Sequence, residues 1–206
     1  MAGKRVGILG GTFDPIHLGH MLIAENAYAH FNLDEVLFVP VGIPHNPEKV
    51  VLDPKTRLAM TGISIEDNCH FALSTIEADK DTVSYTYETI AELKKKNPNN
   101  TYFLIVGADS LMHMDSWECP EKIFSEVSVL VAERIGITSA ELNAKIEEYR
   151  VKYNADIKQL PINCIDFSSS TIRKMVKEGR SIRYMVHYKV IEYINKNHIY
   201  MDEEEK

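Results

Sequence analysis

The stretch GGTFDPIHLGH (10–20) gathers residue types that bind anions or metals directly after a short apolar run, VGIL (6–9). Three kinds of structure use such residues: a phosphate-binding loop, a metal site held by histidines, and a plain turn that ends a strand. Each needs different companions elsewhere in the chain, so the remaining sequence has to discriminate among them.

A phosphate-binding loop explains most of the residues in this stretch. Gly10 and Gly11 allow the backbone to approach a ligand closely, and Pro15 stiffens the turn. A helix that begins near His17 would offer unpaired N–H groups and the positive end of its dipole. His17 and His20 are three positions apart, so both imidazoles would lie at this helix end and donate hydrogen bonds to phosphate oxygens.

The metal site is the weaker alternative. Zinc needs three or four ligands, and no further Cys/His pair follows the two histidines. We therefore expect no metal ion held by a dedicated set of protein ligands. The stretch also matches neither GxGxxG nor GxxxxGK[ST], so it is not one of the two common phosphate-loop fingerprints.

A second candidate anion site is FSSSTIR (167–173). Ser169 or Ser170 can cap a helix there, and free hydroxyls and amides would face an anion. Arg173 supplies a planar fork of donors for phosphate oxygens. The alternative is an ordinary serine cap followed by a solvated arginine. If both stretches bind anions, two helix N-termini far apart in sequence would hold one polyphosphate.

Short apolar runs alternate with amphipathic stretches, which predicts an α/β fold: a Rossmann-like, doubly wound, mostly parallel sheet with helices on both faces. Strands are expected at 5–9, 35–41, 70–74, 101–107, 127–133 and within 156–166, and helices at 18–31, 53–67, 84–97, 138–150, 169–180 and 184–197. Asp53 and Thr138 are predicted N-caps, Thr138 in a capping box with Glu141. Loops that follow strands should share one rim of the sheet, where ligands bind.

The chain is predicted to be a single domain, 1–206, in which a C-terminal helical part, 167–206, completes the anion site. Of the 206 residues 45% are hydrophobic, and the net charge of −7 argues against nucleic acid as a partner. No apolar run approaches the length of a membrane span, and no signal peptide is recognised. Cys69, Cys119 and Cys164 form no CxxC pair, which suggests reduced thiols in a cytoplasmic protein. A homodimer is a reasonable default.

GGTFDPIHLGH resembles the GxFxPxHxGH signature of the HxGH nucleotidylyltransferase superfamily, and FSSSTIR resembles its second conserved segment. The resemblance implies an enzyme that joins a nucleoside monophosphate to a phosphate-bearing acceptor and releases pyrophosphate. It implies that His17 and His20 engage the triphosphate and that Arg173 acts with them. Mg²⁺ would be held mainly through the ATP phosphates.

Further segments are similar to one branch, the nicotinate mononucleotide adenylyltransferases. The similar segments are SYTYETIAEL (84–93), GADSLMHMDSW (107–117), VAERIG (131–136) and IEYINKNHIY (191–200). The resemblance runs in order from about residue 4 to residue 200. It implies transfer of AMP from ATP to nicotinate mononucleotide, which gives deamido-NAD and pyrophosphate in NAD biosynthesis.

The resemblance assigns residues to each substrate. Trp117 would offer a flat face to the pyridine ring and Thr86 a hydroxyl to the nicotinate carboxylate. The simpler alternatives are a core tryptophan, a helix-start threonine and, for Asp109, a helix cap. Implied for ATP are Gly10, Gly11, Thr12, Phe13, His17, His20, Gly107, Asp109, Arg134, Ser169, Ser170 and Arg173, and for nicotinate mononucleotide His45, Asn46, Thr86, Asp109 and Trp117.

Two positions depart from the branch pattern. Asn46 stands where lysine is common and brings no charge, although Lys49 could reach the same phosphate. His187 stands where proline is common, which we interpret as a variation at the start of a helix. Two other functions stay open: a phosphopantetheine adenylyltransferase, whose branch is shorter and lacks the 84–93 and 107–117 segments, and a nucleotide-binding sensor without turnover.

Overall fold

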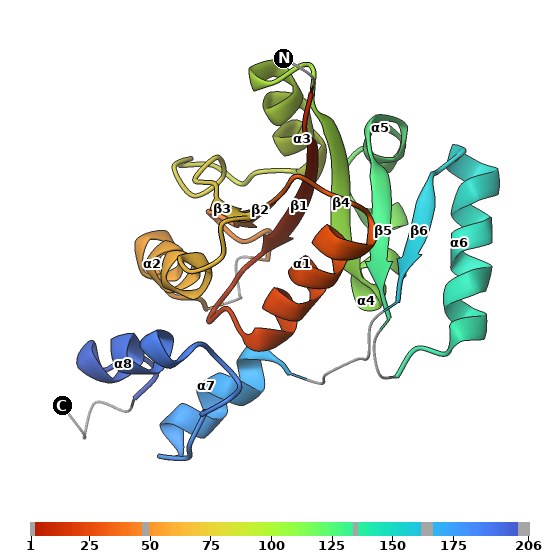
Figure 1. Cartoon of the computed structure of the whole chain (residues 1–206). Helices are drawn as coiled ribbons and strands as arrows, with labels where there is room; N and C mark the ends of the chain where they lie inside the picture. The colour runs from red at the N-terminus through yellow and green to blue at the C-terminus, as the bar shows by residue number, and fades with distance from the viewer. Residues whose placement is uncertain (1–2, 47–49, 134–135, 162–166, 202–206) are drawn as a thin grey trace.

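A computed structural model describes residues 3–46, 50–133, 136–161 and 167–201 (Figure 1). Within these residues the strands form one six-stranded sheet in the order β3-β2-β1-β4-β5-β6. The strands are β1 (Arg5–Gly11), β2 (Glu35–Pro40), β3 (Phe71–Leu73), β4 (Thr101–Gly107), β5 (Ser128–Ala132) and β6 (Ile157–Leu160). Every described pairing is parallel, so the carboxyl ends of all these strands meet at one edge.

The central strand β4 shows why the sheet is covered on both faces. Tyr102, Leu104 and Val106 belong to one buried cluster, whereas Phe103 and Ile105 belong to another. Alternate side chains of a strand point to opposite faces, so an unbroken apolar run must bury both. The apolar runs in the sequence therefore predict the sandwich of helices that is observed.

Each buried cluster defines one helical layer. The first cluster includes residues of α3 (Thr86–Lys96), α4 (Ala108–Leu111), η1 (Met114–Ser116), α5 (Pro120–Glu126) and α6 (Ser139–Tyr153). The second includes residues of α1 (Leu18–His30), α2 (Pro54–Ile65), α7 (Ser169–Lys177) and α8 (Tyr188–Lys196). In Figure 1 the blue helices α7 and α8 lie below the sheet, in the direction in which the β4 and β5 arrows point.

The strand order places β1 between β2 and β4. The chain leaves β1 toward one side of the sheet and later returns on the other side, so β1 and β4 flank a switch in winding direction. Connections diverge at such a point and open a crevice at the carboxyl ends of the two strands. The fold therefore predicts that a ligand binds at the carboxyl ends of β1 and β4.

The elements expected from the sequence are confirmed, with ends that shift by a few residues, and the sixth strand falls at Ile157–Leu160. Asp53 Oδ1 accepts a hydrogen bond from Thr56 N at 3.0 Å, as expected of a cap. The short elements α4, η1 and α5 were not predicted. Among the described residues, no helix is long and apolar enough to cross a membrane.

The Thr138 cap gives a direct test of local stability. Thr138 Oγ1 accepts from Glu141 N at 3.2 Å and Glu141 Oε2 accepts from Thr138 N at 2.9 Å, so both bonds of the capping box are present. Thr138→Ala should lower the free energy of unfolding by about 1 kcal/mol, measured in urea. Ser139→Ala, at an exposed neighbouring serine, is the control. Equal losses in both variants would contradict the assignment of the cap.

Candidate active site

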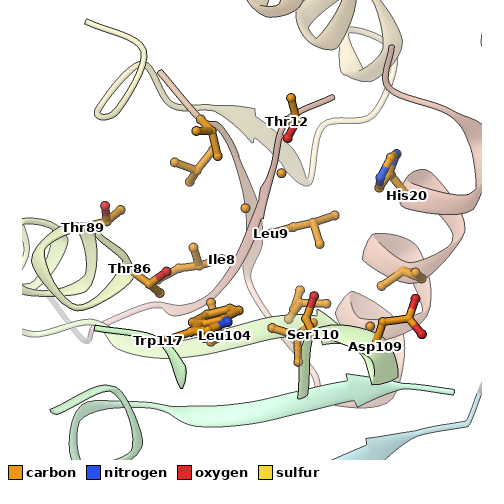
Figure 2. Close-up of a pocket in the computed structure, with 18 of the residues that line it drawn as sticks. Ile8, Leu9, Thr12, His20, Thr86, Thr89, Leu104, Asp109, Ser110 and Trp117 are labelled. Atoms are coloured by element: carbon orange, nitrogen blue, oxygen red, sulfur yellow. The ribbon is translucent and has the colours of Figure 1, made fainter. Parts of the chain in front are cut away.

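A cavity of about 830 Å³ opens at the carboxyl ends of β1 and β4. Its lining comes from the 10–20 loop, the start of α1, the start of α3, the segment after β4 and the start of α7. In Figure 2 His20 and Asp109 lie at one side of the view and Thr86, Thr89 and Trp117 at the other, across β1. The loops predicted to share a rim therefore share a cavity with two distinct ends.

A buried arginine holds the 10–20 loop through a backbone carbonyl. Arg57 of α2 has no exposed surface and donates to three backbone carbonyls: Thr12 O and Gly42 O at 2.8 Å, and Leu52 O at 2.9 Å. Burial lowers the pKa of this guanidinium, and nearby Asp14 and Asp53 act in the opposite sense. One rigid guanidinium thus holds the 10–20 stretch, the loop after β2 and the segment before α2 in fixed positions relative to one another.

The two histidines form the first end of the cavity. Their rings stack with centroids 3.7 Å apart, and His17 N donates to His20 Nδ1 at 3.2 Å. His17 is the N-cap of α1, so both rings lie where the backbone amides of the first turn point outward. Because Nδ1 of His20 accepts a hydrogen bond, a neutral ring carries its proton on Nε2, which can donate to a phosphate oxygen.

Gly19 leaves room for the stacked histidines. A Cβ atom at position 19 would lie 3.0 Å from His17 Nδ1 and 3.1 Å from His17 Cε1. A side chain there would therefore crowd the His17 ring and require it to shift slightly. The sequence alone did not indicate this role of the glycine between the two histidines.

The second helix end also reaches the loop. The N-cap of α7 is Ser168, whose Oγ accepts from Thr171 N at 3.2 Å, so the expectation that Ser169 or Ser170 caps this helix is wrong. The cap falls one residue earlier because Ser168 has the extended backbone of a cap. Ser169 instead donates from its Oγ to Pro15 O at 2.9 Å, which ties α7 to the 10–20 loop.

Arg173 binds the same loop in this structure. Its Nη1 donates to Asp14 O at 2.6 Å and lies 3.9 Å from Asp14 Oδ2. Asp14 is 2% exposed, and its Oδ1 accepts from Tyr200 Oη at 2.5 Å. Burial and the hydrogen bond to Asp14 raise the pKa of Tyr200, so the hydroxyl keeps its proton and remains a donor.

The other end of the cavity combines aromatic and hydroxyl groups. Thr86, the first residue of α3, and Trp117, which follows η1, both line it. Thr89 Oγ1 donates to Glu77 Oε1 at 2.7 Å, and burial raises the pKa of Glu77. The hydroxyl of Ser84 is buried in the lining without a partner among the described residues.

Most of the residues expected from the sequence meet at this cavity. Those that line it are Gly10, Gly11, Thr12, His17, His20, His45, Thr86, Gly107, Asp109, Trp117 and Ser169. Phe13 is instead 2% exposed in the core with its ring nearly perpendicular to that of His20, and Asn46 and Ser170 are exposed outside the lining. Arg173 is also outside the lining and donates to the backbone of Asp14. Arg134 and Lys49 fall outside the described residues.

The structure also bears on the simpler alternatives for Trp117, Thr86 and Asp109. Trp117 packs partly on the core and lines the cavity, so it does both. Thr86 begins α3 with Tyr85 as its N-cap, and Asp109 lies in the first turn of α4 with Gly107 as the cap. His187 is the N-cap of α8, as expected of a variation at a helix start.

The charged side chains of the described lining are acidic. Glu77, Asp109, Glu118 and Glu133 line the cavity, and the described lining holds no lysine or arginine. Positive potential here comes from the N-termini of α1 and α7 and from the imidazoles. Among the described residues no group of three His, Cys, Asp or Glu side chains is placed to hold a metal ion.

Several residues of the site were not predicted from the sequence. Asp14 and Gly19 lie inside the quoted 10–20 stretch, and Tyr200 ends the 191–200 segment, so their positions carried a signal but their partners did not. Arg57 and Glu77 carried no signal. A charged residue in an amphipathic helix or after a strand is normally solvated, and only the fold shows that these are buried.

The Tyr200–Asp14 contact predicts a stability effect. Tyr200→Phe removes the donor from a buried carboxylate and should lower the free energy of unfolding by about 2 kcal/mol. Urea unfolding measures the change. Tyr188→Phe, at a tyrosine that is 60% exposed, is the matched control and should change it little. A Tyr200→Phe protein as stable as Tyr188→Phe would show that this contact contributes nothing.

Comparison with known proteins gives consistent matches over nearly the whole chain. The cytidylyltransferase-like family matches residues 8–175. A probable nicotinate-nucleotide adenylyltransferase of Clostridium botulinum is 39% identical over 97% of this chain and 100% of its own. The protein of the same name from Lachnoclostridium phytofermentans is 37% identical over 96% of this chain and 100% of its own.

A solved structure shows the same fold. Plasmodium falciparum nicotinic acid mononucleotide adenylyltransferase, complexed with NaAD, superimposes with a TM-score of 0.79. The match covers 96% of this chain and 97% of the other at 22% sequence identity. The architecture is therefore that of an α/β nucleotidylyltransferase.

Proposed function

The chain belongs to the cytidylyltransferase-like family. We propose that it is a nicotinate-nucleotide adenylyltransferase. It transfers AMP from ATP to nicotinate mononucleotide and forms deamido-NAD and pyrophosphate, a step of NAD biosynthesis. One observation supports the proposal most directly: a single cavity joins a phosphate-binding end to an aromatic and hydroxyl-bearing end. The relatives with this name, at 37% and 39% identity, support the same assignment.

The ATP triphosphate would lie against the N-terminus of α1. Amides of the first turn and the Nε2–H of His20 donate to its oxygens, and His17 stacks beside that ring. The segment 167–206 would complete this end through Ser169 and the N-terminus of α7. Arg173 would act either on a phosphate directly or, as in the described geometry, by holding the backbone of Asp14.

Nicotinate mononucleotide would occupy the other end. Trp117 provides a flat face for the pyridine ring, and Thr86 Oγ1 together with the amides at the start of α3 faces the carboxylate. Asp109, which lies on the same side as His20 in Figure 2, can accept from ribose hydroxyls. His45 of the loop after β2 would approach the mononucleotide phosphate, and Asn46 would require a shift of this exposed loop to reach it.

The reaction needs no covalent intermediate on the protein. An oxygen of the mononucleotide phosphate attacks the α-phosphorus of ATP in line, one P–O bond forms, and the bond to the β-phosphate oxygen breaks. The attacking group is already ionised, so no general base is required. The contribution of the protein is to hold the reactants in line and to stabilise charge on the leaving pyrophosphate.

Mg²⁺ fits this site as an ion bound to substrate. The described lining has carboxylates, no lysine or arginine, and no ligand cluster, so the charge of the triphosphate needs compensation from elsewhere. When bound to phosphate oxygens, Mg²⁺ would supply that compensation, and Asp109 of the lining could contact it directly or through water. We further propose a cytoplasmic location, in keeping with three cysteines without a pairing pattern.

Substrate comparison tests the assignment. Purified protein with Mg²⁺ and ATP should release pyrophosphate when nicotinate mononucleotide is added, measured by a coupled assay, and EDTA should stop the release. Nicotinamide mononucleotide and phosphopantetheine are the matched alternatives. Release with either of these and none with nicotinate mononucleotide would overturn the acceptor and keep the reaction class. No release with any acceptor would favour a nucleotide-binding sensor.

His20→Ala separates an enzyme from a sensor. Loss of the Nε2 donor should reduce kcat by about two to three orders of magnitude, because a preorganised donor acts mainly on charge that develops in the transition state. ATP affinity, measured by calorimetry, should change far less. His30→Ala, at the exposed end of the same helix, is the control. Small and equal effects on turnover and binding would contradict a catalytic role for His20.

A further inference from the structure

The turn that carries Trp117 has little regular structure of its own. It consists of η1 (Met114–Ser116), and Trp117 follows as the C-cap with an extended backbone. Within the turn, Trp117 N donates to Met114 O at 3.1 Å and Ser116 Oγ donates to His113 O at 2.7 Å. A single 3₁₀ turn is short, so contacts made to the turn from outside add to the packing of Trp117 against the core in setting the position of the indole.

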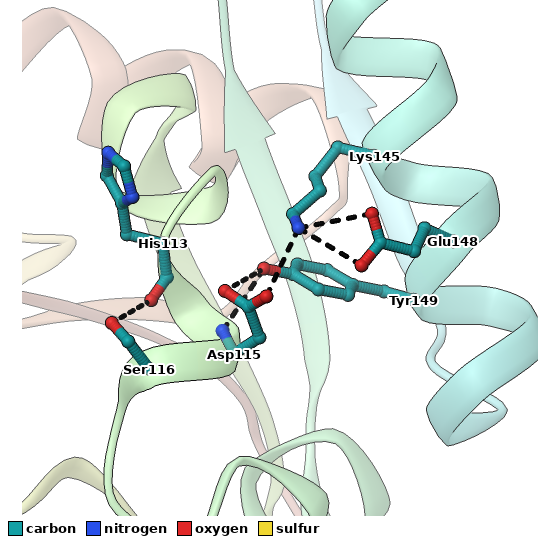
Figure 3. A network of polar contacts seen from close by, with 6 residues as sticks. All are labelled: His113, Asp115, Ser116, Lys145, Glu148 and Tyr149. Carbon is teal, nitrogen blue, oxygen red and sulfur yellow. Dashed lines mark hydrogen bonds and ion pairs between the residues drawn. The ribbon is translucent and has the colours of Figure 1, made fainter.

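Tyr149 of α6 binds both the backbone and the side chain of Asp115 in this turn. The hydroxyl donates to Asp115 Oδ1 at 3.1 Å and accepts from Asp115 N at 3.1 Å (Figure 3). One hydroxyl thus uses its donor and an acceptor lone pair on the same residue, which fixes the orientation of that residue. The Tyr149 side chain is fully buried, and its ring packs against Phe124 with centroids 5.1 Å apart.

Lys145 adds an ion pair to the same residue. Its Nζ lies 3.3 Å from Asp115 Oδ2 and 3.1 Å from each carboxylate oxygen of Glu148, and it sits 4.7 Å from the centre of the Tyr149 ring. The Lys145 side chain is only 14% exposed, so the pair is better shielded from water than an ordinary surface pair. Figure 3 shows Lys145 and Tyr149 converging from α6 on the two oxygens of Asp115.

The charge state of this cluster is stable near neutral pH. Hydrogen bonds from Lys145 and Tyr149 lower the pKa of Asp115. Although burial acts in the opposite sense, bonds to Glu148 and Asp115 raise the pKa of Lys145. A carboxylate with a lowered pKa keeps its contacts at neutral pH and loses them only as the pH falls through that pKa.

We propose that Tyr149 is a positioning residue for the acceptor: with Lys145 it clamps Asp115 and so holds Trp117 against the pyridine ring of the mononucleotide. The inference rests on the proposed function for the identity of that ring. Neither Tyr149 nor Lys145 lines the cavity, so the clamp acts through the turn. It acts on the acceptor end alone, since the triphosphate end is held by α1, α2 and α7.

The fluorescence of Trp117 tests the clamp without any substrate, because the chain has a single tryptophan. In Tyr149→Phe, acrylamide should quench Trp117 more strongly and its emission should shift to the red. Tyr153→Phe is the matched control on the same helix: its ring stacks on Phe124 at 5.0 Å, but no hydrogen bond of its hydroxyl to the 112–117 turn is present in the described structure. Asp115→Ala removes the other partner of the contact and should reproduce the change.

Kinetics test the consequence at the site. In Tyr149→Phe the KM for nicotinate mononucleotide should rise about tenfold, because a displaced contact surface misaligns the acceptor, while the KM for ATP stays unchanged. Unaltered Trp117 quenching in Tyr149→Phe and Asp115→Ala would overturn the proposal, as would equal increases in both KM values. If the acceptor proves to be a different molecule, the fluorescence result still decides whether Tyr149 positions Trp117.

Discussion

The rest of the site depends on the hydrogen bonds that Asp14 accepts. Asp14 is buried, its Oδ1 accepts a hydrogen bond from the hydroxyl of Tyr200, and its backbone carbonyl accepts one from Arg173. A buried polar group without partners is costly, so these bonds from α7 and from the chain after α8 stabilise the loop. The loop that follows β1 and the helices at the other end of the chain therefore stabilise one another.

The winding of the sheet provides the second constraint. Because β1 and β4 are neighbours, the loop after β1 and the turn after β4 must face each other across the crevice. One supplies the histidines and helix amides, and the other supplies Asp109 and Trp117. Strand order thus brings the loop after β1 and the segment after β4 to one cavity, and the clamp from α6 acts on Trp117 alone.

Much of this arrangement could be predicted from the sequence, and the part that could not has identifiable causes. Apolar runs and caps such as Thr138 predict elements because their signals are local. Local signals do not reveal partners, so nothing in the sequence marked Arg57 as buried, and Phe13 was expected to bind ATP although it packs in the core. The serine cap of α7 was displaced by one position because Ser168, Ser169 and Ser170 are chemically equivalent, and only backbone conformation distinguishes them.

The bond between Tyr200 and Asp14 joins residues 186 positions apart. During synthesis the 10–20 loop leaves the ribosome long before Tyr200, so in a nascent chain Asp14 lacks its tyrosine donor until residue 200 has emerged. A chain that stops before Tyr200 keeps the histidine stretch and loses this contact.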